Sequence, residues 1–198
     1  MVRAISKVRM CICGADTKRP GNLRKFLDPP ILLVLKVRDR PLMGAWLHMA
    51  RILIADEDDE VRRMLVVSLV DHGHEIGAVP DGHRACAVLS EDLPDLILLD
   101  ALLPGRDGFD VLEELNGSGR REGTRVLMLT ARGSEQNATR AFELGADGYI
   151  TKPLDPAELV VQVERMLALS SDELESSRER ELDRSRLLSQ LESILGDN

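Results

Sequence analysis

The chain has 198 residues, of which 43% are hydrophobic and 30% are charged, and its formal net charge is -8. This is the composition of an ordinary globular protein of one or two domains, and it excludes a collagen, a coiled-coil rod and a fully disordered tail. No apolar run approaches the roughly 18 residues that span a bilayer. Three cysteines are too few for a disulfide framework. We therefore expect a soluble protein, not associated with a membrane, in the reducing environment of the cytoplasm.

The charges divide the chain into two parts. The chain has 26 basic and 34 acidic residues. Residues 1–50 contain 10 basic and 3 acidic residues, a net charge of +7. The remaining 16 basic and 31 acidic residues give residues 51–198 a net charge of -15. This break predicts that residues 1–48 are a basic N-terminal extension, either disordered or produced by a start codon assigned upstream of the natural one. Because nonspecific nucleic-acid binding needs clustered basic groups, the acidic main part predicts no direct DNA binding.

The middle of the chain alternates short apolar runs with segments that have apolar residues at helical spacing. Five runs have the pattern of strands buried on both faces, at residues 51–56, 74–79, 95–100, 125–130 and 149–151. The helical patterns that follow them lie at residues 61–69, 81–89, 109–115, 135–144 and 156–169. Strands that alternate with helices in this way predict an α/β fold, a five-stranded, doubly wound parallel sheet with right-handed crossovers.

In such a sheet, the functional site lies at the carboxyl ends of the strands. The residues there are Asp56 and Glu57 after the first strand, Asp100 after the third, Thr130 after the fourth and Lys152 after the fifth. Three neighbouring carboxylates repel one another, and a hard, oxygen-binding cation such as Mg²⁺ would compensate them. With the cation and the lysine in place, one carboxylate could attack a phosphoryl group and form an acyl phosphate, while the threonine donates a hydrogen bond.

Four segments of this region resemble the receiver domain of bacterial response regulators. The segments are ILIADEDDEVRRML (52–65), PDLILLDALLPGRDGFDVL (94–112), VLMLTARGSEQ (126–136) and LGADGYITKPLDPAELV (144–160). Their order makes the resemblance specific, and it covers about residues 50–169. It implies a receiver domain over residues 49–169, with the flavodoxin-like or CheY-like strand order 2-1-3-4-5 and a C-terminal helical extension.

The resemblance implies a phosphorylation site and a metal site at the predicted edge. Asp100 is implied to be the aspartate that accepts the phosphoryl group. Asp56 and Glu57 are implied to be the acidic pair that holds Mg²⁺ together with Asp100, and the backbone carbonyl of Leu102 is implied to complete the metal site.

The resemblance also implies a switch. Thr130 would be the switch hydroxyl, Tyr149 the aromatic side chain that changes rotamer with it, and Lys152 the lysine that pairs with the phosphoryl group, before a cis Pro153. Asp100, Thr130 and Lys152 together would carry the chemistry. The phosphoryl donor would be a histidine kinase or a histidine phosphotransfer protein. The chain would then act as a signalling switch, not as an enzyme, and bind a downstream effector through its fourth helix and fifth strand.

The C-terminal segment, residues 170–198, is predicted to be a charged amphipathic helix. An apolar stripe recurs there at helical spacing, formed by Leu187, Leu188, Leu191, Ile194 and Leu195. About two heptads do not make an independently stable coiled coil, so the stripe predicts either a frayed tail or a docking or dimerising helix, and a homodimer stays open. Only 29 residues follow Leu169, too few for a winged helix or a catalytic output domain, so we expect a receiver without an output domain.

Two other functions stay open. The first is a metal-dependent phosphohydrolase of the haloacid-dehalogenase type, which would use Asp56 and Asp58 as an Asp-x-Asp motif. This hypothesis leaves Asp100 and Lys152 unexplained, and Glu60 stands where that family has Thr or Val. The second is an adaptor on the receiver fold that works without phosphorylation.

The histidines and one cysteine of the main part show no metal-binding pattern. His72, His74 and His83 lack ligand spacing and are expected on the surface. Cys86 lies on the apolar face of its helix and is expected in the core.

Overall fold

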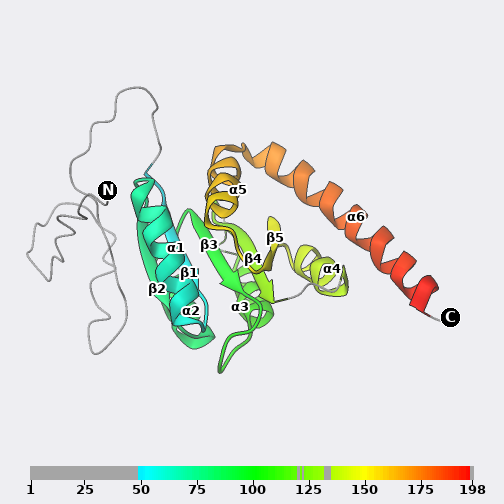
Figure 1. Ribbon diagram of the computed structural model, residues 1–198, viewed down its shortest axis with the longest axis horizontal. Helices are drawn as coiled ribbons and strands as arrows, with labels where there is room; N and C mark the ends of the chain where they lie inside the picture. Colours follow the sequence, from blue (N-terminus) through cyan, green and yellow to red (C-terminus); the bar gives the residue numbers. More distant parts are fainter. Residues whose placement is uncertain (1–48, 120, 122, 132–134, 197–198) are drawn as a thin grey trace, which may run out of the picture.

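The structure, a computed structural model, describes residues 49–119, 121, 123–131 and 135–196 (Figure 1). The basic extension predicted over residues 1–48 lies outside this range. The strands are β1 (Arg51–Ala55), β2 (Glu75–Val79), β3 (Leu96–Asp100), β4 (Arg125–Ala131) and β5 (Gly148–Lys152). The helices are α1 (Asp59–Asp71), α2 (Gly82–Glu91), α3 (Gly108–Gly117), α4 (Glu135–Glu143), α5 (Pro156–Ala168) and α6 (Ser171–Gly196). Each predicted strand and helix of the main part is confirmed.

Within the described residues, the strands form one five-stranded parallel sheet in the order β2-β1-β3-β4-β5. This is the predicted fold class and the predicted strand order. Alternate residues of the strands point to opposite faces, as they must in extended backbone. In β1, Ile52 and Ile54 pack with α1 and α5, whereas Leu53 packs with α2 and α3 on the other face. The sheet is therefore buried between two helical layers.

Aspartates cap the helices at the edge where the strands end. The side chain of Asp58 accepts hydrogen bonds from the amides of Glu60 and Val61 at the start of α1. Three further aspartates cap α2, α3 and α5 in the same way: Asp81, Asp107 and Asp155. A carboxylate at this position satisfies free amides and interacts favourably with the helix dipole. Much of the acidic charge at this edge thus serves local structure.

The expectation that His74 lies on the surface is wrong. Its side chain is fully buried between the start of β1 and α5. The amide of Ala50 donates to Nδ1 at 3.4 Å, so the ring hydrogen is on Nε2, which donates to Glu164 at 3.0 Å. His72 and His83 are exposed, as expected, and Cys86 is half-buried against the core.

The C-terminal segment forms one continuous helix, α6, which packs along α4 (Figure 1). The expected helix is confirmed, but its apolar stripe is not the face that contacts the receiver. Leu187, Leu191 and Ile194 are 62%, 54% and 68% exposed. The more buried positions of α6 recur on another face and are mostly polar: Leu174, Ser177, Arg178, Glu181, Leu182, Ser185 and Ser189. Among the described helices, none is long and apolar enough to cross a membrane.

Gly108 is required where α3 meets the end of β3. A Cβ atom at this position would collide with the carbonyl oxygen of Asp100 and the backbone of Ala101. We expect Gly108→Ala to lower the free energy of unfolding by about 1–3 kcal/mol, because backbone atoms cannot yield as a flexible side chain can. Gly117 in the same helix has open space around it, so Gly117→Ala should be neutral or stabilising by up to about 1 kcal/mol. Urea unfolding compares the two variants, and equal stabilities would contradict the close approach.

Candidate functional site

Three side chains meet at the carboxyl edge of the sheet. Asp56 directly follows β1, Asp100 is the last residue of β3, and Lys152 is the last residue of β5. Nζ of Lys152 lies 2.6 Å from Oδ2 of Asp56 and 2.6 Å from Oδ2 of Asp100. Both carboxylates are buried. One ammonium therefore bridges two carboxylates in a region sheltered from water.

The electrostatics of this cluster favour a further cation. Burial raises the pKa of Asp56, because the loss of water disfavours the carboxylate more than hydrogen bonds from Lys152 and the Asp58 amide favour it. Burial alone would lower the pKa of Lys152, but its hydrogen bonds to Asp100 and Asp56 outweigh this effect, and the pKa is raised. Lys152 therefore stays charged at neutral pH. Its single charge does not neutralise two carboxylates.

Backbone amides hold both carboxylates in place. The amide of Asp58 donates to Oδ1 of Asp56 at 2.9 Å, and the amide of Leu102 donates to Oδ1 of Asp100 at 3.0 Å. Each aspartate thus gives one oxygen to the amide two residues further along and the other to Lys152. This local turn geometry fixes the side chains before any ligand binds.

Of the two predicted switch residues, Thr130 lies close to the same edge, whereas Tyr149 lies near the start of β5. Thr130 is buried in β4, and its neighbour Leu129 pairs with Asp100 across the sheet. Thr130 itself pairs with Thr151, the residue before Lys152. Tyr149 is half-buried against the face that α2 and α3 cover. The peptide bond that follows Lys152, to Pro153, is cis.

The oxygen donors at this edge suit Mg²⁺, although they are fewer than the sequence suggests. Among the described residues, no three His, Cys, Asp or Glu side chains are grouped so as to hold a metal ion. Glu57 is exposed beside Asp56, and the side chain of Leu102 is exposed as well. The buried donors are the carboxylates of Asp56 and Asp100, and the exposed carboxylate of Glu57 and loop carbonyls are further donors beside them. This set of oxygen atoms fits a cation that keeps several of its waters, as Mg²⁺ does.

Arg62 also belongs to this site, although no sequence motif pointed to it. Its side chain is buried in α1, and Nη1 donates to the carbonyl oxygens of Asp56 at 2.7 Å and Glu57 at 2.9 Å. Nη2 donates to Asp59 at 2.7 Å. The guanidinium therefore fixes the backbone of the acidic loop after β1. A signal was present, because position 62 lies three residues before Leu65 on the buried face of α1.

The response regulator receiver domain matches residues 52–164 of this chain. The chain belongs to this family. Its receiver is 40% identical over 116 residues to the phosphate regulon transcriptional regulatory protein PhoB of Pseudomonas aeruginosa. This match covers 59% of this chain and 51% of PhoB. The receiver is 37% identical over 123 residues to the DNA-binding response regulator MtrA of Mycolicibacterium smegmatis. This match covers 62% of this chain and 53% of MtrA. The chain thus spans about half the length of these curated relatives.

Solved receiver structures have the same fold. The chemotaxis response regulator CheY4 of Vibrio cholerae superposes with a TM-score of 0.56 at 29% identity, over 59% of this chain and 98% of that one. A CheY-like receiver domain protein of Methanospirillum hungatei superposes with a TM-score of 0.57 at 29% identity, over 65% of this chain and 98% of that one. Domains of this family are generally signalling switches of two-component systems and bind Mg²⁺ at an acidic phosphorylation site.

Removal of the bridging lysine should expose its electrostatic role in this receiver. Lys152→Met keeps most of the volume but leaves two buried carboxylates without their partner, which should lower the free energy of unfolding by about 3 kcal/mol. Millimolar Mg²⁺ should recover part of this loss, because a second cation can compensate the same carboxylates.

Thermal unfolding in EDTA and in Mg²⁺ measures both effects. Arg63→Met is the matched control, since Arg63 is an exposed arginine on α1 whose ion pair with Asp59 is at the surface. This control should change stability little and should respond to Mg²⁺ as the parent does. Parent-like stability of Lys152→Met in EDTA would contradict the bridging role.

Proposed function

We propose that this chain is a two-component receiver that accepts a phosphoryl group on Asp100 and thereby switches its binding to a partner protein. The observation that carries the proposal is the position of Asp100. Its buried carboxylate lies at the end of the central strand β3, 2.6 Å from Lys152, and is oriented by the amide of Leu102. A carboxylate held in this way is already oriented for attack on a phosphoryl group.

The transfer would proceed from a phosphohistidine of a histidine kinase or a histidine phosphotransfer protein. A bond forms between one carboxylate oxygen of Asp100 and phosphorus while the phosphorus–nitrogen bond breaks, and the imidazole leaves. Mg²⁺ held by Asp56, Glu57, Asp100 and the carbonyl of Leu102 would supply positive charge to the transferred oxygens.

The side chains of this chain would then respond to the new charge. Lys152 is released from the carboxylate of Asp100 and pairs with the phosphoryl oxygens. The hydroxyl of Thr130 donates to the same oxygens, and Tyr149 changes rotamer as the threonine moves. Contacts that exist in one state and not in the other are what shift a population between two conformations. The effector would recognise the new arrangement of α4 and β5.

The role of Asp58 disfavours the phosphohydrolase alternative. Its carboxylate accepts the amides of Glu60 and Val61 as the cap of α1, so it is engaged in helix structure and is not directed at a substrate. That alternative also gives no role to the bridge between Asp100 and Lys152. The adaptor alternative likewise gives no role to the carboxylates of Asp56 and Asp100, which are held around the ammonium of Lys152.

We assign residues 49–169 to the receiver and residues 170–198 to a helical tail, and we treat residues 1–48 as a separate extension. The receiver would work in the cytoplasm, where a kinase can reach it. Neither DNA nor a membrane is a partner in this proposal, because the main part of the chain carries a balance of -15 and phosphate surfaces attract basic groups. A homodimer is compatible with the proposal and is not required by it.

Phosphorylation of Asp100 is the direct test. Incubation with Mg²⁺ and a small-molecule phosphodonor should add one acid-labile phosphoryl group per chain, detected by mass spectrometry, and Asp100→Ala should abolish it. Asp58→Ala is the matched control: it should be labelled like the parent while losing about 1 kcal/mol of stability with its helix cap. Loss of labelling in Asp58→Ala, with retention in Asp100→Ala, would favour the hydrolase.

A further inference from the structure

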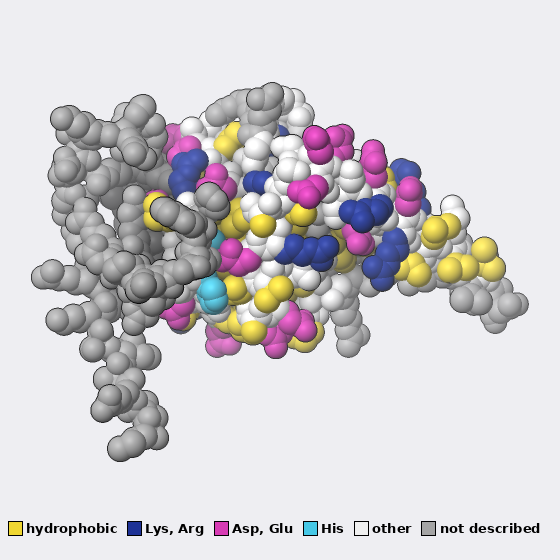
Figure 2. All heavy atoms as spheres, turned by 90° about the horizontal axis from the view of Figure 1, so that it is seen from above, with side chains coloured by type: hydrophobic (Ala, Val, Ile, Leu, Met, Phe, Trp, Pro, Cys, Tyr) yellow, Lys and Arg dark blue, Asp and Glu magenta, His cyan; other side chains and the backbone are white. Residues whose placement is uncertain are grey.

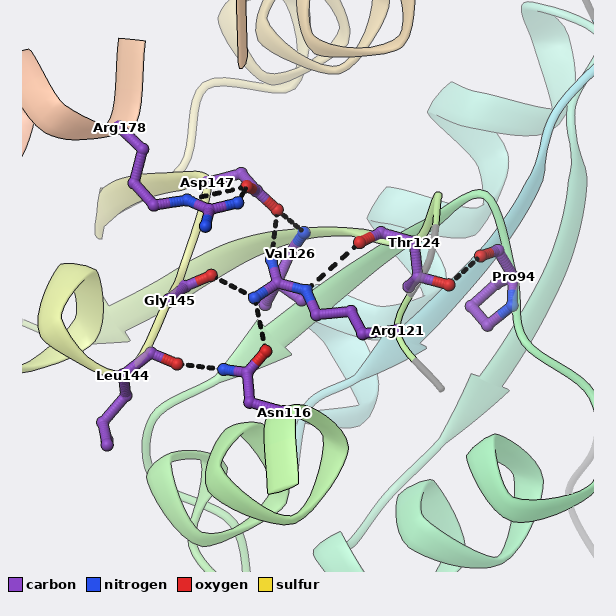
Figure 3. A network of polar contacts seen from close by, with 9 residues as sticks. All are labelled: Pro94, Asn116, Arg121, Thr124, Val126, Leu144, Gly145, Asp147 and Arg178. Atoms are coloured by element: carbon purple, nitrogen blue, oxygen red, sulfur yellow. Dashed lines mark hydrogen bonds and ion pairs between the residues drawn. The ribbon is translucent and has the colours of Figure 1, made fainter. Parts of the chain in front are cut away.

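A second ionic cluster lies at the opposite edge of the sheet, where β4 and β5 begin (Figure 3). Its centre is Asp147, the residue before β5, whose side chain is 0% exposed. The carboxylate accepts the amide of Val126 at 2.7 Å, the guanidinium of Arg121, and both Nε and Nη2 of Arg178, with Nε at 3.1 Å. A buried carboxylate is thus shared between two arginines.

The receiver residues of this cluster, Asp147 with Arg121 and Val126, form a fixed binding site for Arg178, which we call the Asp147 socket. Arg121 also donates to Asn116 at 2.7 Å and to the carbonyl oxygens of Gly145 and Thr124 (Figure 3). Burial lowers the pKa of Arg121, although Asp147 opposes the shift. These contacts join the end of α3 to the loops before β4 and β5. The position of Asp147 is therefore set by the receiver itself, whether or not α6 is present.

Arg178 comes from α6, which begins beyond the matched receiver at residues 52–164. Elsewhere along the described part of α6, Leu174 packs against the hydrophobic core. Arg186 pairs with Glu143 of α4 at 2.9 Å, but both side chains are about half exposed, and such pairs contribute little. Of the α6 side chains that the structure describes, Ser185 is buried and most others lie partly or fully in solvent. The docking of α6 on α4 therefore depends largely on the pair of Arg178 with Asp147.

The apolar stripe of α6 points away from this interface. Figure 2 shows hydrophobic side chains gathered at the projecting end of the helix, and Leu187, Leu191 and Ile194 are exposed there. On the contacting face, Leu174 packs against the hydrophobic core and Leu182 is half-buried, but the other more buried positions are polar or charged, so apolar burial contributes only part of the docking. The ion pair of Arg178 with Asp147 is the charged part of this contact, and a competing charged partner can replace it.

The strand β5 connects the ionic clusters at the two edges. Asp147 directly precedes it and Lys152 is its last residue. On the other side, α4 begins five residues after Thr130, and α6 packs along α4. Both elements that hold α6 are therefore attached to residues that would contact a phosphoryl group on Asp100.

We propose that α6 is a displaceable cover of α4, held by Arg178 in the Asp147 socket, and that phosphorylation of Asp100 releases it. The inference rests on the proposed function and adds its regulation and the kind of partner. The surface under α6 offers Asp147 and, at its rim, Glu143. It fits a helix that carries two arginines eight residues apart, the spacing of Arg178 and Arg186, which is about 12 Å along a helix.

Amide hydrogen exchange on the full chain tests this coupling. Beryllium fluoride with Mg²⁺ serves as the phosphoryl mimic, and exchange is followed over residues 171–196. In the parent, we expect the mimic to speed exchange in α6 at least about fivefold, the lower end of ordinary coupling between sites. Arg178→Met should exchange rapidly in α6 without the mimic. By linkage, it should also bind the mimic more tightly by the same factor.

Arg180→Met is the matched control, because Arg180 is exposed and, among the described residues, donates within α6 to the carbonyl of Ser176. It should behave like the parent in both measurements. A labelled peptide of residues 171–196 tests the kind of partner. It should bind the full chain loaded with beryllium fluoride, and the peptide with Arg178→Met should bind at least about tenfold more weakly, since the socket loses its cation.

The outcomes separate this inference from the proposed function. If the mimic binds, is lost in Asp100→Ala, and leaves exchange in α6 unchanged, α6 is a fixed part of the fold and the inference is overturned while the function stands. If the mimic does not bind at all, the proposed function fails. If the amides of β1 and β3 are no longer protected in Arg178→Met, this variant has not folded. The exchange of α6 in the parent, measured with and without the mimic, then decides whether phosphorylation releases α6.

Discussion

The ammonium of Lys152 between the carboxylates of Asp56 and Asp100 is the interaction on which the rest of the structure depends. Buried carboxylates at the ends of β1 and β3 repel each other, and the lysine at the end of β5 lies between them and compensates part of their charge. This places three separate strand ends under one electrostatic constraint. Because Lys152 is shared, the phosphorylation of Asp100 that we propose would change the contacts of Lys152 and thereby the end of β5.

The opposite end of β5 carries a second charge constraint. Asp147 is buried between Arg121 and Arg178, so the short strand is held by ion pairs at both ends. The carboxyl-edge pairs lie inside the receiver, whereas Arg178 brings in a helix from outside it. A buried carboxylate that loses one of its partners is costly, which gives the docked position of α6 its specificity although few apolar groups support it.

The sequence predicted the sheet and the carboxyl-edge residues because their signals are local. Each strand of the core is a short apolar run, and Asp56, Asp100 and Lys152 directly end or follow such runs. In a parallel sheet, this position alone brings them together. Arg62 and His74 could not be placed in this way. Each is polar in its own sequence context, and each is buried because a neighbouring element, the acidic loop for Arg62 and α5 for His74, supplies its partner.

Apolar periodicity and strand ends are properties of short segments, so they predicted the five-stranded parallel sheet and the residues at its carboxyl edge, whereas the strand order followed from the resemblance of four segments to receiver domains. The position of α6 was decided by the tertiary structure. Its apolar stripe favours docking through Leu187 and Leu191, yet these side chains stay exposed, while Arg178 binds Asp147 in front of β5 and Ser185 is buried. The reason is that Asp147 is desolvated by packing of the whole receiver, and a buried carboxylate binds a guanidinium more strongly than a short apolar stripe binds an exposed helix.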